Sequence, residues 1–487
     1  MSIIEQLYYL LIFLLTLMPF VLIAQLLFRI SIDNKKILKL SLPVALIMGP
    51  VFLSILLELI IRYFPKENNM FYLLYIPFIG ISLVVFLLFY CYKKKLFLQG
   101  WQYKNIKSVK SKTSIKDDTL TILFIISMIF LFLATLFGFL IENDPLEYAS
   151  TAKTIYQQKD LTHYPFVDTN FSDGYYGPWT HGLGYINLWV WSYLVAEFDG
   201  ITNSARFISV YYLLALNFFI IKLSEVFLKT LHIGKLAAIF LCISPVIIGG
   251  VIGSHIDIIR IALLFNSLIL FYIYLQKPSL KFLIFMSLSV GLALYTHSLN
   301  ILLFPIIAIL WLIHEKKISL SMLKDGFIFL FFSLLFVIPS YIINIKLFGL
   351  PIADSGAVPV WGLPNLHYDE WFFILRDLES QVSRLFYGVL KGFTRPDWFG
   401  LSYYFFIGAF YYYVSGILKK SGAESCLLTK YLLKVILIFF SFVFITYIFG
   451  YDIFIKNYRY QMTIQPFIAF FSAVMLYKYL LIKKNNA

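Results

Sequence analysis

Apolar runs that are long enough to cross a lipid bilayer recur along the whole chain. The protein has 487 residues, of which 60% are hydrophobic and only 14% are charged. A run of about 18 to 25 apolar residues spans the hydrocarbon core of a membrane as a helix. A membrane barrel would instead alternate apolar with polar residues along each strand. The sequence therefore predicts an all-α integral membrane protein.

The apolar runs predict about thirteen transmembrane helices, and no part of this sequence is expected to fold as a sizeable soluble domain. The predicted spans are 6–29, 40–63, 70–92, 119–141, 205–228, 236–253, 258–275, 281–296, 299–314, 326–347, 401–418, 431–450 and 462–482.

The distribution of charge predicts the orientation of these helices. The net charge is +14, but the basic residues lie in short loops between apolar runs and form no continuous basic face, so a nucleic-acid partner is not expected. Alternate loops, of which 93–118 is the most basic, hold more than half of the 40 Lys and Arg residues. Because such loops face the cytoplasm, we expect a multi-pass protein of the cytoplasmic (inner) membrane, with its N-terminus outside and its C-terminus in the cytoplasm.

One apolar segment, 184–198, is too short and too rich in Trp and Tyr to count as a span. Counting it would invert every later loop against the charge bias, so we expect it to lie in the membrane interface.

Two parts of the chain are predicted. Residues 1–118 are expected to form a three-helix membrane extension with a basic cytoplasmic loop, and residues 119–487 a larger membrane domain. The latter carries two long external segments, 142–204 and 348–400, where function is expected. Within the second, residues 370–393 have the periodicity of an amphipathic helix that lies on the membrane as a linker or a lid.

Three carboxylates gather where the fourth predicted span ends, in the sequence Glu142-Asn-Asp144-Pro-Leu-Glu147-Tyr148. Carboxylates at a lipid boundary are costly unless solvated or paired, and they often mark binding or proton-transfer sites. A structural alternative is equally open, since Asp144 before Pro145 also fits a helix N-cap.

The rest of this external segment combines histidines, carboxylates and aromatic rings. His163 and His181 lie among Tyr175, Tyr176 and Trp179. Aromatic faces with carboxylates suit a sugar, although an interfacial aromatic belt has the same composition. The spacing is not that of a metal site, so no metal ligand is predicted, and a divalent cation stays open as a cofactor.

Charged residues also occur at two later external positions. Ser254-His255-Ile-Asp257 precedes Arg260, and either a site or a simple internal pair of Asp257 with Arg260 explains both charges. Before the last span, Lys456 and Arg459 lie among tyrosines on the side where cations are rare. Two interpretations are open: these cations bind a phosphate at headgroup depth, or their side chains simply snorkel to the membrane interface.

These motifs resemble, in their order, those of the GT-C superfamily of membrane glycosyltransferases, over about residues 120–482. The branch concerned contains the protein O-mannosyltransferases and the lipid A aminoarabinose transferase. The resembling segments are Asp144-Pro-Leu-Glu147-Tyr148, Trp179-Thr-His181-Gly-Leu-Gly-Tyr185, Leu241 through Asp257, Gly291-Leu-Ala-Leu-Tyr-Thr-His297, and Tyr458-Arg459-Tyr460 with Pro466. Pro145 replaces the acidic residue that usually follows the first aspartate, and His297 stands where lysine is usual.

The resemblance implies a GT-C-like fold and an inverting transfer of a sugar from a polyprenyl-phosphate carrier to a glycan, lipid or protein acceptor at the outer face. It implies Asp144 as the base, with Glu147 and Asp257 orienting acceptor and sugar. Arg459, Lys456 and Tyr460 would bind the donor phosphate. The expected substrate contacts are Tyr148, Tyr176, His181, His255 and His297.

Two other classes are open. A polysaccharide polymerase or ligase would share the spans and the lipid-linked substrate, but would depend on external arginines such as Arg376, Arg384 and Arg395. A transporter of lipid-linked sugars would need charged or broken-helix positions near mid-membrane, and most spans lack ionisable residues at their centres.

Overall fold

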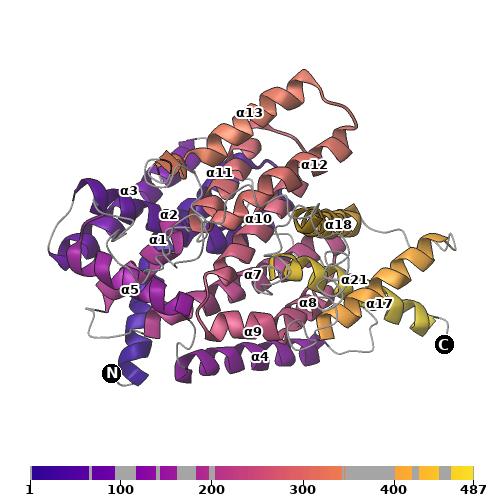
Figure 1. The fold of residues 1–487 in the computed structure, drawn as a ribbon, viewed down its shortest axis with the longest axis horizontal. Helices are drawn as coiled ribbons and strands as arrows, with labels where there is room; N and C mark the ends of the chain where they lie inside the picture. The colour runs from indigo at the N-terminus through magenta and orange to yellow at the C-terminus, as the bar shows by residue number, and fades with distance from the viewer. Residues whose placement is uncertain are drawn as a thin grey trace, which may run out of the picture.

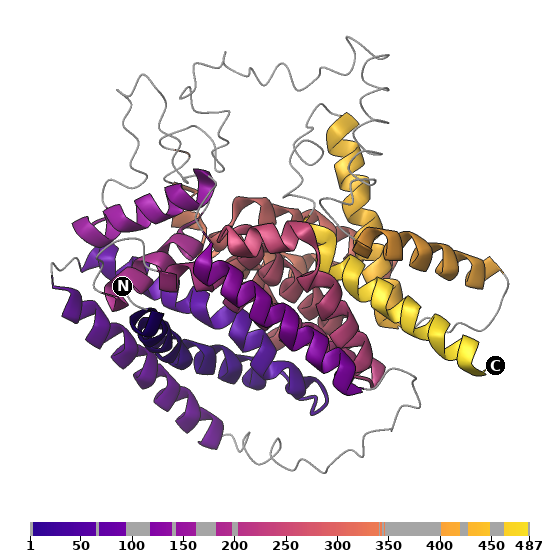
Figure 2. The same cartoon turned by 90° about the horizontal axis from the view of Figure 1, so that it is seen from below.

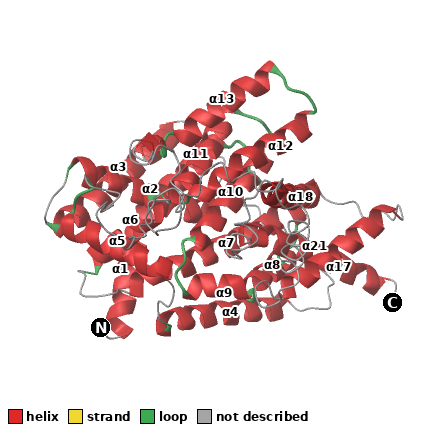
Figure 3. Cartoon of the chain, viewed as in Figure 1, coloured by secondary structure: helices red, strands yellow, loops and turns green. Residues whose placement is uncertain are grey.

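The structure of the protein is a computed structural model. It describes residues 3–64, 68–93, 117–138, 143–161, 182–196, 203–339, 341–342, 345, 401–418, 427–448 and 462–485. Within these ranges the ordered elements are all helical and none is a strand (Figure 3). The predicted all-α class is therefore confirmed.

The helices follow the predicted apolar runs. In chain order they are α1 (Ile3–Ser31), η1 (Ile37–Leu40), α2 (Ser41–Tyr63), α3 (Asn69–Lys93), α4 (Asp117–Phe137), α5 (Asn143–Gln158), α6 (Leu183–Val195), α7 (Asn203–Leu228), α8 (His232–Cys242), α9 (Pro245–Ile252), α10 (Asp257–Gln276), α11 (Leu280–Thr296), η3 (Ser298–Leu302), α12 (Leu303–Glu315), α13 (Leu320–Leu334), α17 (Leu401–Leu418), α18 (Leu427–Ile448), η5 (Met462–Ile464) and α21 (Gln465–Asn485).

Eight of the described helices are long and apolar enough to cross a membrane. A ninth candidate is the pair α8 and α9, which is bent by 68° where Ser244 and Pro245 interrupt the helix. The protein is thus a multi-pass membrane protein. The predicted span at 326–347 differs most from the structure, because α13 begins six residues earlier and ends at Leu334.

The helices surround a central element, α10. It lies near the middle of the bundle in Figure 1, and its residues from Asp257 to Leu275 are all buried. The N-terminal helices α1, α2 and α3 lie toward one end of the longest axis, and α17, α18 and α21 lie toward the other (Figures 1 and 2). By contrast, α3 and α4 expose most of their apolar side chains, as expected of helices that face lipid.

The short helix α6 is not at a surface. All 13 of its residues are buried, and α6 packs against α2 and α5. The described residues 184–196, which were expected in the membrane interface, are therefore enclosed by neighbouring helices, and their depth in the membrane stays a prediction. The polar groups of α6 explain its position, because the indole Nε1 of Trp191 donates to Thr16 Oγ1 of α1 at 2.8 Å.

The first helices are packed into the body of the protein. α2 packs against α6 and α7, and α1 packs against α7 and α11. An ion pair also joins Lys39, before α2, to Glu225 near the end of α7 at 3.1 Å. A domain boundary at 118/119 stays a prediction, but α1 and α2 share one continuous hydrophobic core with the later helices.

Polar contacts sort the helix ends into two groups. One group of contacts joins helix ends that the charge pattern predicts in the cytoplasm, namely Lys39 with Glu225, Tyr274 with Asp325, and Lys235 with Thr121. The other group joins helix ends that the charge pattern predicts outside, namely Tyr295 with Glu58, Arg206 with Gly138, and Tyr185 with Ser254. We call these groups the inner end and the outer end of the bundle; which of them faces the cytoplasm stays a prediction.

Candidate functional site

The helix α5 brings the first acidic motif to the outer end. It begins at Asn143, so Asp144 lies in its first turn, where a carboxylate is favourable at the positive end of the helix dipole. The side chain of Asp144 is outside the described part of the structure. Glu147 is half-buried and Tyr148 is only 2% exposed. Two of the residues predicted here therefore lie against the body of the protein.

Tyr148 contacts the second predicted motif through an aromatic pair. Its ring meets that of Tyr185 in α6 edge to face, with centroids 5.5 Å apart. The hydroxyl of Tyr185 donates to the backbone oxygen of Ser254, 2.5 Å away, beside the start of α10. Burial raises the pKa of Tyr185 well above its usual value, and the nearby charge of Asp257 raises it further. Tyr185 is thus a neutral donor that links α5 to the segment carrying Asp257.

Asp257 forms an ion pair with Arg260. Its Oδ1 accepts from Arg260 Nε at 2.8 Å and lies 2.7 Å from Arg260 Nη2. Both residues are at most 2% exposed. The internal pair considered from the sequence is therefore present. Nη1 of Arg260 also donates to Thr463 Oγ1, which fixes the start of the last helix, three residues after Tyr460 in the sequence.

His255 lies between these elements. It is 1% exposed, and its backbone oxygen accepts from Ser209 Oγ of α7 at 3.4 Å. The preceding Ser254 adopts a left-handed conformation with φ of 58°, which turns the chain sharply between α9 and α10. The turn places the His255 ring inside the outer end of the bundle.

A close approach of two backbones brings α6 to the end of α11. A Cβ added to Gly182 would lie 1.7 Å from the backbone oxygen of Tyr295, so only glycine fits there. His297 lies two residues after Tyr295 in the sequence and is 3% exposed. Its Nδ1 accepts from the backbone N–H of Leu299 at 3.0 Å, which leaves the ring proton on Nε2. His297 therefore offers a donor in this arrangement and not the fixed charge of a lysine.

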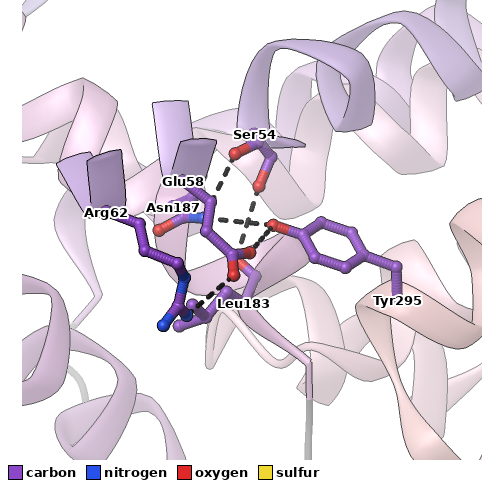
Figure 4. A network of polar contacts seen from close by, with 6 residues as sticks. All are labelled: Ser54, Glu58, Arg62, Leu183, Asn187 and Tyr295. Atoms are coloured by element: carbon purple, nitrogen blue, oxygen red, sulfur yellow. Dashed lines mark hydrogen bonds and ion pairs between the residues drawn. The ribbon is translucent and has the colours of Figure 1, made fainter. Parts of the chain in front are cut away.

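A polar network joins α2, in the N-terminal part of the chain, to α6 and the end of α11 (Figure 4). Glu58 of α2 accepts from the Tyr295 hydroxyl at 2.5 Å and pairs with Arg62 at 3.0 Å. The side-chain amide of Asn187 in α6 donates both to the Tyr295 oxygen and to the backbone oxygen of Ser54, each at 3.2 Å. We call these five residues the Glu58 network. It joins α2, α6 and α11, and sequence reasoning missed it.

A second buried cation, Arg206, was also missed. It lies in the first turn of α7 and is 4% exposed. Its Nη1 donates to the backbone oxygen of Gly138 at 2.7 Å and its Nη2 to that of Ile252 at 3.4 Å. The sequence did hold a signal, since an arginine at the outer end of a predicted span opposes the positive-inside bias. Glu58 and Arg62 gave a similar signal as an i,i+4 pair in an apolar run.

The structure therefore gathers Tyr148, Asp257, His255 and His297 at the outer end, together with the half-buried Glu147. The other predicted site residues lie outside the described residues, and so do the arginines of the polymerase alternative; these are Tyr176, His181, Lys456, Arg459, Tyr460, Arg376, Arg384 and Arg395. Among described residues, no group of three or more His, Cys, Asp and Glu side chains is placed to hold a metal ion.

Comparisons with protein-family models, with curated proteins and with solved structures found no match to the chain.

Proposed function

We propose that the chain is an inverting glycosyltransferase of the GT-C type. In this proposal it crosses the cytoplasmic membrane about thirteen times, and it moves a sugar from a polyprenyl-phosphate carrier to a glycan, lipid or protein acceptor at the outer face. The observation that carries the proposal is the contact chain from Tyr148 through Tyr185 to the segment of Asp257. These contacts join motifs that are more than 100 residues apart in the sequence, and the motifs follow the order of the resemblance.

The chemistry needs a base that faces the acceptor and charge stabilisation for the departing phosphate. In the proposal, Asp144 takes the proton of the acceptor hydroxyl or amine as its oxygen or nitrogen attacks the anomeric carbon. The bond from that carbon to the phosphate oxygen breaks, and the lipid phosphate leaves with the electron pair. Arg459 and Lys456, with Tyr460, neutralise the leaving group.

The buried ion pair supports the orienting role expected of Asp257. A carboxylate that already accepts twice from Arg260 is held in one position. We therefore assign Asp257 to orientation of the substrate or of the neighbouring His255. Tyr148, which packs against Tyr185 of α6, and the half-buried Glu147 would contact the sugar with His297, Tyr176 and His181.

Consumption of a lipid-linked donor tests the reaction class. Purified protein in nanodiscs would be given a panel of polyprenyl-phosphate sugars with radiolabel in the sugar, together with crude envelope acceptors. We expect one donor to be consumed and its label to appear in an acceptor, while nucleotide sugars, the control donors, are left intact. The Arg459→Ala variant should bind this donor more weakly.

Consumption of no lipid-linked donor would contradict the proposal. Loss of activity in alanine variants of Arg376, Arg384 and Arg395, with full activity in Asp144→Asn, would instead favour the polymerase or ligase reading.

A further inference from the structure

The guanidinium of Arg206 is a buried positive charge at the outer end of the bundle. Its two hydrogen-bond acceptors are backbone oxygens, that of Gly138 at the end of α4 and that of Ile252 at the end of α9. The negative ends of two helix dipoles offset part of its charge. Carbonyl groups carry no net charge, however, so the cation itself is not neutralised.

Arg206 differs from the neighbouring arginines in its ion pairing. At the same end Arg260 pairs with Asp257 and Arg62 pairs with Glu58. In the part of the chain that the structure describes, no carboxylate pairs with Arg206, and its Nε is buried without a hydrogen-bond partner. The two ion pairs each sum to zero, so of these three described arginines Arg206 keeps a net positive charge. An unpaired buried charge is strongly destabilising and marks a candidate functional site in a membrane protein.

The surroundings of Arg206 connect it with the candidate site. Its backbone oxygen accepts from Ser254 Oγ at 3.4 Å, in the turn that carries His255 and leads to Asp257. On the same face of α9 as Ile252, Gly249 has no atom within 4 Å of the place where a Cβ would lie. Gly249 is exposed, so the surface of α9 is open one helical turn before Ile252, whose backbone oxygen accepts from Arg206.

A planar guanidinium with an unused donor binds a phosphate group well, because two parallel N–H donors match two phosphate oxygens. We propose that Arg206 is a binding residue for the phosphate group of a lipid, at the junction of α4, α7 and α9. The anion would bond to Nε and replace the longer of the two carbonyl bonds, that to Ile252. Identification of the lipid as the polyprenyl-phosphate donor or product rests on the proposed function; the phosphate site itself does not.

Lipid binding by the full-length protein tests this site without any transfer reaction. Native mass spectrometry of detergent-solubilised protein would measure the affinity for a polyprenyl phosphate, for the uncharged polyprenol and for phosphatidate. We expect Arg206→Gln to weaken phosphate-lipid binding by about 10- to 100-fold, the effect of one charge-assisted interaction. Arg62→Gln is the matched control, since Arg62 is at the same end but already paired with Glu58, and it should change binding less than twofold.

The lipid panel separates the sources of the phosphate. Preference for polyprenyl phosphate over phosphatidate would identify the carrier lipid, and equal binding of both would identify a general headgroup site; either result supports the phosphate site. Equal binding of polyprenol and polyprenyl phosphate, or unchanged binding by a folded Arg206→Gln variant, would overturn it.

A measurement on the wild type covers the case in which Arg206→Gln does not fold. A polyprenyl phosphate with a photoreactive group beside the phosphate should label the ends of α4 and α9, near Gly138 and Ile252. Labelling confined to other parts of the chain would overturn the proposal.

Discussion

The ion pairs at the outer and the inner end of the bundle differ in how deeply they are buried. At the inner end, Lys39, Lys222 and Glu225 form ion pairs whose side chains are 24 to 34% exposed. At the outer end, Asp257 and Arg260 are almost completely buried, and Glu58 bonds to a buried tyrosine. Water can solvate the first set when a pair is broken, whereas breaking the pair of Asp257 and Arg260 leaves a charge inside the protein. A chain keeps buried charges at a cost, so the outer end is where function is expected.

The largest expected effect concerns the buried pair. Arg260→Leu should leave Asp257 as an uncompensated buried charge and lower the free energy of unfolding by about 3 to 5 kcal/mol. Lys222→Leu at the inner end is the control, and its half-exposed pair should contribute less than about 1 kcal/mol. Thermal unfolding in detergent measures both. Equal losses for the two variants would remove the distinction between the ends.

A smaller effect is expected from a methyl group at the closest backbone approach. Gly182→Ala would place a Cβ against the backbone oxygen of Tyr295, and we expect a loss of about 1 to 3 kcal/mol from overpacking. Gly326→Ala, within α13 at the inner end, meets no atom within 4 Å and should stabilise the helix by about 0.5 to 1 kcal/mol. If Gly182→Ala were as stable as the wild type, the contact of α6 with α11 would be wrong.

Matched tyrosine variants refine the comparison further. Tyr295→Phe removes the hydroxyl that donates to the buried Glu58, and about 1 to 3 kcal/mol of stability should be lost with it. Tyr274→Phe removes a similar bond, to the half-buried Asp325 at the inner end, where water can replace the donor. Its loss should be below about 1 kcal/mol. A larger loss for Tyr274→Phe would contradict the account of the Glu58 network.

Local sequence patterns predicted the helices and the Asp257–Arg260 pair, because a hydrophobic run and an i,i+3 spacing are both visible along the chain. The Glu58–Tyr295 bond joins residues 237 positions apart and depends on how α2 meets α11. No local pattern records such a contact. The burial of α6 was missed for a related reason: its Trp and Tyr side chains are typical of an interface, but Trp189 and Trp191 are fully buried by neighbouring helices.

Asp144 is the base of the proposed reaction, and its replacement is the most direct test of the account. Asp144→Asn keeps the size of the side chain but removes its basicity, and Asp33→Asn changes an exposed carboxylate at the inner end as the control. We expect Asp144→Asn to lower the rate of sugar transfer from the polyprenyl-phosphate donor by about 10²- to 10⁴-fold. Asp33→Asn should transfer at the wild-type rate. Undiminished transfer by a folded, inserted Asp144→Asn variant would contradict the assignment of the base and, with it, the proposed mechanism.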